Sequence, residues 1–420
     1  MAGPPAPKGM ILTDFSTLDL HPALIRALAA EDITEPTPIQ SQAIPHILAG
    51  RDVMGLAQTG TGKTAAFGLP LVHMLMGRGK AAPKAPRALI LAPTRELVNQ
   101  IAASLTSLSR DMPISVATVV GGASINAQVQ RLKRGTDILV ATPGRLIDLL
   151  NRGAVTLGSA EKLVLDEADQ MLDLGFIHAL RRIAQHLPER RQTTLFSATM
   201  PKAMAELSAT YLRDPVRVQV TPPGVAAERI AQAVHFIDQS GKARLLQEYL
   251  NAHPGELALV FSRTKHGAEK LMKLLTSWGF QAASIHGNKS QGQRERALKG
   301  FRSGHTHVLV ATDVAARGLD IPAVRHVYNL DLPDVPEAYV HRIGRTARAG
   351  AEGNAMAFCA PSEIGSLRAI EKTLGNPLRI AGGTPPAESA ASKPGRRPGG
   401  ARGGAEGRSR RPQRRPRKAA

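Results

Sequence analysis

The sequence predicts an α/β protein of two tandem units, each a parallel sheet covered by helices on both faces. Short runs rich in Val, Ile and Leu, such as residues 87–93 ("RALILAP"), alternate with longer segments of helical period, such as residues 96–109 ("ELVNQIAASLTSLS"). Continuous apolar runs are typical of strands buried on both faces, as in parallel sheets whose crossover helices cover both sides. By the same pattern we expect further strands, in chain order, at residues 137–142, 162–166, 257–262 and 307–312.

Two pairs of these runs repeat along the chain. "LILAPTRE" is similar to "ALVFSRTK", and "ILVATPGR" is similar to "VLVATDVAARG". Thr94 and Thr142 are 48 residues apart, and so are Thr264 and Thr312. The repeat predicts two copies of one α/β unit.

Composition shifts indicate where the units begin and end. The hinge is expected near residues 215–228, where "DPVRVQVTPPGVAAERI" has three prolines and few helix signals. From about Ala381 the chain is Gly, Pro, Arg, Ala and Ser with little to bury, which predicts disorder. The predicted parts are a flexible N-terminus at 1–12, a first domain at 13–217, a linker at 218–228, a second domain at 229–380 and a disordered, Arg-rich tail at 381–420.

Charge and composition favour a globular protein that meets a polyanion. The chain has 420 residues, of which 43% are apolar, and 54 Lys and Arg against 34 acidic residues give a net charge of +20. Such an excess is expected of proteins that bind nucleic acid. Cys359 is the only cysteine, so it excludes an intramolecular disulfide and a cysteine metal cluster, and we expect it in a core. The histidines do not show metal-site spacing. No apolar stretch approaches 18 residues and no signal peptide is recognisable, so we expect a cytoplasmic, unanchored protein.

A glycine-rich turn at residues 53–67 ("VMGLAQTGTGKTAAF") lies between a predicted strand and a helical segment. That context favours a P-loop, in which backbone N–H groups and a helix N-terminus surround phosphate oxygens. Lys63 would reach the terminal phosphates, and Thr64 would offer its hydroxyl to Mg²⁺. Ala57 stands where the general pattern has its first glycine.

Three carboxylates, Asp166, Glu167 and Asp169, follow another predicted strand in "LVLDEADQML". They would repel one another without a cation. We interpret them as part of a nucleotide site in which Asp166 holds Mg²⁺ through its water shell and Glu167 orients and deprotonates the attacking water. A solvated helix start with acidic residues at the dipole is the alternative, and the P-loop upstream argues against it.

The order of short motifs carries a resemblance. The chain contains "EPTPIQ", "AQTGTGKT", "PTREL", "GG", "TPGR", "DEAD", "SAT", "VFSRTK", "QGQR", "ATDVAARGLD" and "YVHRIGRTARAG", which span nearly all of residues 15–350. This set resembles the DEAD-box ATP-dependent RNA helicases of superfamily 2, and "HGNKSQGQR" with the Arg-rich tail resembles their bacterial RhlE-like branch. The resemblance implies two RecA-like domains that hydrolyse ATP with Mg²⁺ at their interface to unwind short RNA duplexes locally or to remodel RNA–protein complexes.

For the nucleotide, the resemblance implies that Gln40 reads the adenine edge with support from Thr37 and Phe15. Many relatives have an aromatic residue on the adenine ring seven positions before that glutamine, where this chain has Ile33. The implied nucleotide contacts are Phe15, Thr37, Gln40, Thr59, Gly60, Thr61, Gly62, Lys63, Thr64, Asp166, Gly318 and Asp320, with Thr64 and Asp166 at the metal.

For catalysis, the resemblance implies Lys63, Glu167 and two arginine fingers, Arg345 and Arg348, which meet charge on the γ-phosphate only when the units close. Ala347 replaces a glycine often found between the fingers, and we expect little effect from its methyl group if its φ is negative. The implied coupling residues are Ser197, Thr199 and His341, each expected to hydrogen-bond to Asp169.

For RNA, the resemblance implies a groove of sequence-blind donors to phosphate and sugar. Its residues are Pro93, Thr94, Arg95, Gly122, Thr142 and Arg145 on the first unit and Arg263, Gln291, Arg294 and Thr312 on the second. Aromatic residues are only 3% of the chain, so stacking platforms are scarce and we expect recognition of backbone shape and 2′-hydroxyls. Residues 381–420 hold eleven Lys or Arg and two Glu, which supply +9 of the charge. We expect this tail to tether RNA, the alternative being a solubilising end.

The sequence disfavours two other functions. A DNA helicase on the same paired units is disfavoured by "DEAD" with "PTPIQ" and by the lack of room for DNA-specific domains. An RNA-binding or annealing scaffold without catalysis is disfavoured by the intact catalytic residues. Ribosomal RNA and ribonucleoprotein complexes are candidate targets, ribosome assembly and RNA decay both stay open as pathways, and we expect a monomer without a membrane partner.

Overall fold

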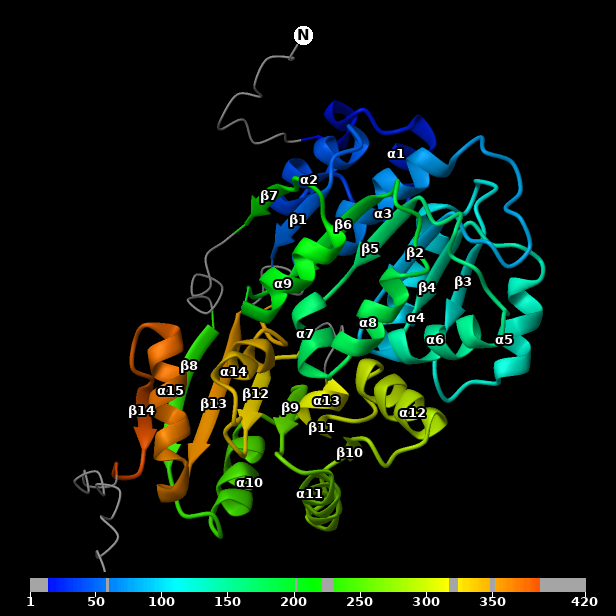
Figure 1. Ribbon diagram of the computed structural model, residues 1–420. Coiled ribbons are helices and arrows are strands. Elements are labelled where there is room, and N and C mark those ends of the chain that lie inside the picture. The colour runs from blue at the N-terminus through cyan, green and yellow to red at the C-terminus, as the bar shows by residue number, and fades with distance from the viewer. Residues whose placement is uncertain are drawn as a thin grey trace, which may run out of the picture. The chain divides into compact units, whose positions relative to one another are not determined.

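The structure is a computed structural model that describes residues 14–57, 60–200, 202–220, 230–316, 324–347 and 352–385. The expected flexible N-terminus and nearly all of the expected tail lie outside the described residues. Within them the chain forms two seven-stranded sheets with the strand orders β3-β4-β2-β5-β6-β1-β7 and β10-β11-β9-β12-β13-β8-β14 (Figure 1). All the strand pairs are parallel. The predicted fold class is confirmed.

The first sheet takes its strands from residues 53–219. They are β1 (Val53–Leu56), β2 (Ala88–Leu91), β3 (Val116–Val119), β4 (Ile138–Ala141), β5 (Lys162–Leu165), β6 (Gln192–Ser197) and β7 (Val216–Gln219). The helices are α1 (Pro22–Ala29), α2 (Pro38–Leu48), α3 (Lys63–Leu75), α4 (Arg95–Leu108), α5 (Ile125–Leu132), α6 (Pro143–Asn151), α7 (Ala168–Asp173), α8 (Ile177–Ala184) and α9 (Lys202–Tyr211), after a 3₁₀ turn at Phe15–Leu18.

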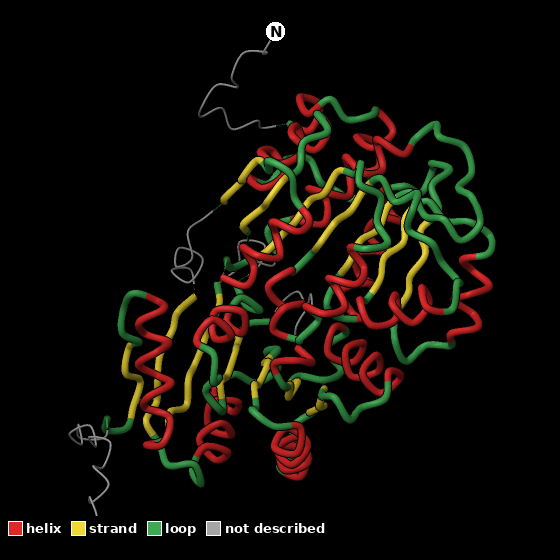
Figure 2. The backbone as a smooth tube through the Cα atoms, in the orientation of Figure 1, coloured by secondary structure: helices red, strands yellow, loops and turns green. Residues whose placement is uncertain are grey.

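Both faces of this sheet are buried, which explains why its central strands are continuous apolar runs. Along β2, Ile90 packs in a core with residues of α1 to α4, whereas Leu89 and Leu91 pack in a second core with residues of α6 to α9. Successive side chains of a strand point to opposite faces, so a strand covered on both sides needs apolar residues at every position. Figure 2 shows the strands flanked by helices.

The second sheet repeats this plan. Its strands are β8 (Ile230–Phe236), β9 (Ala258–Phe261), β10 (Ala282–Ile285), β11 (Val308–Ala311), β12 (His326–Asn329), β13 (Gly353–Cys359) and β14 (Arg379–Gly382). The helices are α10 (Lys242–Ala252), α11 (Lys265–Ser277), α12 (Gln291–Arg302), α13 (Asp313–Ala316), α14 (Pro336–Ile343) and α15 (Ile364–Leu374), with a 3₁₀ turn at Pro361–Glu363. Two further apolar cores cover its faces, and Cys359 lies in one of them as expected.

The predicted duplication is confirmed strand by strand, because the two sheet orders match position for position. Thr94 and Thr264 each follow a central strand by three residues and cap the next helix, accepting hydrogen bonds from Leu97 N at 3.2 Å and Gly267 N at 3.0 Å. Thr142 directly follows β4, the neighbour of β2, and Thr312 directly follows β11, the neighbour of β9. The equal spacing of 48 residues therefore reflects equal positions in two copies of one unit.

The domain boundaries need a correction of about two residues. The linker was expected to begin at residue 218, but β7 runs to Gln219 and pairs with β1, and Val218 is buried in the first core. The second domain was expected to end at residue 380, but β14 continues to Gly382. Both are edge strands, with half of the side chains of β7 and most of those of β14 exposed, so they lack the apolar run that marked the central strands. Among the described residues, we find no helix with the length and apolar character that crossing a membrane requires.

Candidate functional site

The P-loop lies between β1 and α3, as its sequence context indicates. Gly60 and Gly62 have φ of +86° and +88°, a region that residues with a side chain avoid. A Cβ at Gly62 would also lie 2.5 Å from Gln40 Nε2, so the turn has no space for a larger residue. Lys63 begins α3 and is 6% exposed, and its Nζ has no hydrogen-bond partner among the described residues. Thr64 follows it in α3, and Thr59 is outside the described residues.

Gln40 connects the P-loop to the segment before it. Its Oε1 accepts a hydrogen bond from Thr37 N at 2.9 Å, and its Nε2 donates to Gly62 O at 3.0 Å. Phe15 is buried in the same apolar core as residues of α2, so it supports this segment by packing. Ile33 is half-buried and packs against that core too. The adenine contacts of these residues stay predictions.

The three carboxylates gather at the end of β5 and the start of α7, and all are buried. Burial raises the pKa of Asp166, and it raises the pKa of Glu167 to about 7, opposed in both cases by the charge of Lys63. Glu167 has φ 50° and ψ 51°, the left-handed region, which is strained for a residue with a side chain. Its Oε2 has no hydrogen-bond partner in the described part of the chain.

A buried ammonium group and a buried carboxylate oxygen that both lack hydrogen bonds indicate a ligand site. Leaving a buried polar group unsatisfied costs about 1–3 kcal/mol, more when it is charged. The donor set fits the expected ligands, because Lys63 suits a phosphate, and the Thr64 hydroxyl with the Asp166 carboxylate suits Mg²⁺, which prefers oxygen ligands.

Asp169 holds the turn that follows β6. Its Oδ2 accepts hydrogen bonds from Ala198 N at 3.1 Å, Thr199 N at 2.9 Å and Thr199 Oγ1 at 3.0 Å. The expected bond from Ser197 is wrong, since its hydroxyl donates to Thr199 O at 2.7 Å within the same turn. His341 Nε2 is 3.8 Å from Asp169 Oδ2, which is too long for a hydrogen bond and makes an ion pair only if the imidazole is protonated.

Of the two expected arginine fingers, Arg345 is described and Arg348 is not. Arg345 is buried, its Nε donates to His341 O at 3.2 Å, and its charge lowers the pKa of Glu167. Ala347 has φ +55°. We expected its methyl group to have little effect only if its φ were negative, and this condition is not met. Gly318 and Asp320 are outside the described residues.

Six of the predicted RNA residues line one groove of about 520 Å³. They are Pro93, Thr94, Arg95, Thr142, Arg145 and Arg294. Gly122 has φ +71°, and a Cβ there would lie 1.9 Å from Arg95 Nη1, so glycine permits the guanidinium to lie against the backbone. Burial lowers the pKa of Arg95, the charge of Glu96 opposes this, and the charges of Arg294 and Arg145 lower it further. Four basic residues line the groove against two carboxylates, so it is electropositive and suits a polyanion.

Nine of the lining residues were not predicted from the sequence, among them Glu96 and Lys289. Glu96 Oε1 pairs with Arg294 Nε at 2.9 Å, although the motif "PTREL" had indicated only Pro93, Thr94 and Arg95 before it. Lys289 lines the groove two residues before the predicted Gln291, whose Oε1 accepts a hydrogen bond from Arg95 Nη1 at 3.4 Å. Arg263 and Thr312 are not among the lining residues and lie at the ends of β9 and β11.

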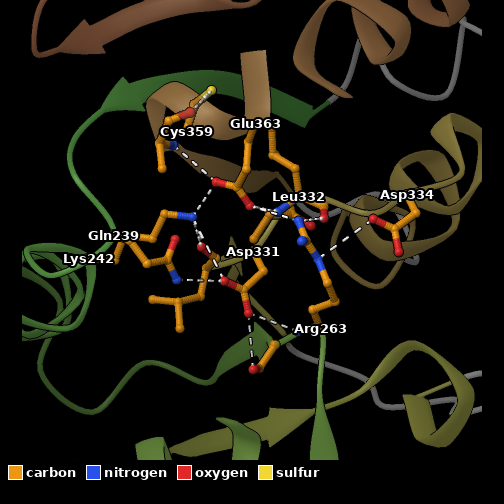
Figure 3. A network of polar contacts seen from close by, with 12 residues as sticks. Gln239, Lys242, Arg263, Asp331, Leu332, Asp334, Cys359 and Glu363 are labelled. Carbon is orange, nitrogen blue, oxygen red and sulfur yellow. Dashed lines mark hydrogen bonds and ion pairs between the residues drawn. The ribbon is translucent and has the colours of Figure 1, made fainter. Parts of the chain in front are cut away.

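Arg263 is held by a polar network that no motif had indicated (Figure 3). Its Nη2 donates to Glu363 Oε1 at 3.0 Å, and its backbone N–H donates to Asp331 Oδ2 at 2.9 Å. Glu363 Oε2 in turn accepts from Lys242 Nζ at 2.5 Å. Asp331 follows strand β12, a position in the sheet at which other site residues also occur. The network fixes both the backbone and the guanidinium of Arg263.

Comparison with known proteins agrees with this geometry. The DEAD/DEAH box helicase family matches residues 37–207, and the helicase conserved C-terminal domain matches residues 241–350. The chain is 44% identical to the ATP-dependent RNA helicase CshA of Listeria monocytogenes over 362 residues, covering 86% of this chain and 69% of that protein. It is 43% identical to the DEAD-box ATP-dependent RNA helicase CshA of Geobacillus kaustophilus, covering 86% and 77%.

Two solved structures have the same fold. Dbp5 of S. cerevisiae bound to RNA and ADP BeF3 is 30% identical, with a TM-score of 0.79 and coverage of 88% of this chain and 96% of that one. Mss116p bound to ssRNA and AMP-PNP is 28% identical, with a TM-score of 0.82 and coverage of 91% and 82%. The two parallel-sheet units are therefore tandem RecA-like domains, and the chain belongs to the family of DEAD-box ATP-dependent RNA helicases.

Proposed function

We propose that this protein is an RNA-dependent ATPase that uses ATP with Mg²⁺ to unwind short RNA duplexes locally or to remodel RNA–protein complexes. The observation that carries the proposal is the pair of buried, unsatisfied groups beside the P-loop, Lys63 Nζ and Glu167 Oε2. The relatives whose names and structures include ATP-dependent helicase activity, RNA and nucleotide analogues support it.

In the proposed reaction Lys63 binds the terminal phosphates, while Thr64 and Asp166 would hold Mg²⁺. The metal would supply positive charge to the phosphoryl group during transfer. Glu167 accepts the proton of the attacking water, and its burial, which raises its pKa, makes the carboxylate a stronger base. Arg345, with Arg348, meets the charge that develops on the phosphoryl group.

We propose that RNA binds the electropositive groove through its backbone, without sequence specificity. Arginines and hydroxyls at helix starts suit phosphate and sugar oxygens, which carry no sequence information. We also propose a cytoplasmic monomer that acts on ribosomal RNA or ribonucleoprotein complexes, in ribosome assembly or RNA decay. Membership of the RhlE-like branch stays a prediction.

An RNA-stimulated ATPase assay with a DNA of the same sequence tests the proposal. We expect hydrolysis to rise with RNA and not with DNA, to disappear in Lys63→Ala, and to stop in Glu167→Gln while ATP binding persists. Lys270→Ala and Glu189→Gln change exposed residues of the same types and should match the wild type. Equal stimulation by DNA would point to a DNA translocase, and RNA binding without any hydrolysis would point to a scaffold.

A further inference from the structure

A cluster of three side chains lies at the opposite end of the second sheet from the strand ends that carry Arg263 and Thr312. His253 directly follows α10, and Glu256 lies in the loop that leads into β9. His326 is the first residue of β12, which pairs with β9 so that His326 lies beside Ala258. The start of two neighbouring parallel strands therefore brings together residues up to 73 positions apart in the chain.

The ligand atoms of the cluster lie close enough together to share one metal ion. Each residue offers one ligand atom, and the three atoms all lie within 4.8 Å of one another. The rings of His253 and His326 have their centroids 4.2 Å apart, and His326 Nε2 is 2.5 Å from Glu256 Oε2. The His326 ring also stacks on Tyr328 at an interplanar angle of 6°, which holds its orientation. The spacing of the histidines in the sequence did not indicate this cluster, because its members come from separate segments of the chain.

Two imidazole nitrogens and one carboxylate oxygen are a ligand set of Zn²⁺ when a fourth position is left to water. The ligands must be a neutral imidazole and an ionised carboxylate. An ion that binds through His326 Nε2 therefore replaces the proton shared with Glu256 Oε2.

Two features weaken the site. At bond lengths of about 2.1 Å and a tetrahedral angle, two ligand atoms lie about 3.4 Å apart, so Glu256 must move about 1 Å away from His326. Its carboxylate is 42% exposed and has room to do so. Arg325, which precedes His326, adds positive charge that opposes a cation. Imidazole ligands favour Zn²⁺ and Cu²⁺ over Mg²⁺. The cluster should therefore select a different metal from the site of Thr64 and Asp166, whose ligands are oxygens.

We propose that His253, Glu256 and His326 form a binding site for a divalent transition metal ion, and that this ion is Zn²⁺. The bound ion fastens the loop between α10 and β9 to the start of β12. The proposal does not depend on ATP or RNA.

The test is a zinc titration of the full chain without an affinity tag, stripped of metal and held in excess Mg²⁺ to occupy oxygen-rich sites. We expect one Zn²⁺ per chain, competed by a coloured chelator, and binding at least tenfold weaker in His253→Ala and in Glu256→Gln. Both substitutions change exposed residues, so folding is retained, and the RNA-stimulated ATPase with Mg²⁺ should be unchanged. His266→Ala removes an exposed histidine of the same domain and is the control.

Co²⁺ gives a second readout, because its visible absorption becomes intense in a tetrahedral site. We expect this spectrum in the wild type and in His266→Ala but not in His253→Ala. Zinc binding of equal strength in the wild type and in both cluster variants would overturn the proposal, and so would an equal loss in His266→Ala.

Discussion

Removing the ammonium group of Lys242 should destabilise the second domain strongly. Lys242 is 1% exposed, and its Nζ donates to Glu363 Oε2 at 2.5 Å and to Leu330 O at 2.7 Å, with Asp331 Oδ1 at 3.8 Å. In Lys242→Met the methionine side chain still fills the space of the lysine side chain. Glu363 stays charged and buried, but it loses the cation that lies beside it. The variant therefore isolates the effect of the charge from that of packing.

Breaking a buried ion pair by removing one partner typically costs about 3–5 kcal/mol. Glu363 would retain three donors, namely Arg263 Nη2, Leu332 N at 3.1 Å and Ala360 N at 3.0 Å. We therefore expect a loss near the lower end, about 3 kcal/mol. With a urea m-value of about 2 kcal/mol/M for a domain of this size, the midpoint should fall by roughly 1.5 M.

Trp278 is the only tryptophan, and it packs against the apolar core that contains residues of α10, the helix that begins with Lys242. Its fluorescence during urea unfolding therefore reports on the second domain. Lys273→Met changes an exposed lysine of α11 and should stay within about 0.5 kcal/mol of the wild type. The double variant Lys242→Met/Glu363→Gln should lose less than the sum of its singles. A loss below 1 kcal/mol in Lys242→Met would refute the reasoning.

Three further predictions follow from single residues. Ala347→Gly should raise the stability of the second domain by about 0.5–1 kcal/mol in the Trp278 assay. An alanine in the left-handed region costs about 1–2 kcal/mol, and the larger chain entropy of glycine in the unfolded state offsets part of the gain. A lower stability of the variant would contradict this. Cys359 should react with a thiol reagent at pH 8 only as fast as the protein unfolds, because burial excludes the reagent and raises its pKa to about 11; rapid labelling of native protein would show an open core. Hydrogen bonding by Lys289 helps to lower the pKa of Glu269 from 4.5 to about 2, so its charged form stabilises the fold above pH 4.5 and this contribution is lost as the pH falls toward 2. Glu269→Gln should therefore differ from the wild type most at pH 6, and a difference that grows with acidity would contradict the assignment.

The sequence was sufficient for the central strands and for the residues that follow them. β2, β4, β9 and β11 are apolar at every position, and β5 is apolar after Lys162, because helices cover both of their faces, and that pattern is visible without a structure. Phosphate chemistry likewise requires glycines and a lysine in a fixed local order, so the P-loop was recognisable. The duplication was visible because equal positions in two copies of a unit have equal spacing.

The remaining features depend on contacts between distant segments. β7 and β14 are edge strands with many exposed side chains, and their residues resemble those of a loop. The positive φ of Ala347 and the hydroxyl direction of Ser197 are set by their turns, and no residue type announces them. Lys242 and Glu363 are 121 residues apart and make a buried pair only when α10 packs beside the turn before α15.

The strand order of the first sheet also determines when the ATP site can form during synthesis. β1, which leads into the P-loop, lies between β6 and β7, and its Val53 pairs with Thr194 and with Val216. The ribosome must therefore add about 140 residues after the P-loop strand before that strand has its first neighbour in the sheet. At roughly 5–20 residues per second this delay is about 7–28 s, during which an apolar strand and its glycine turn have no sheet to join. A nascent chain of this protein consequently acquires its phosphate site late, and arrest of translation before residue 194 should yield a chain that cannot bind ATP.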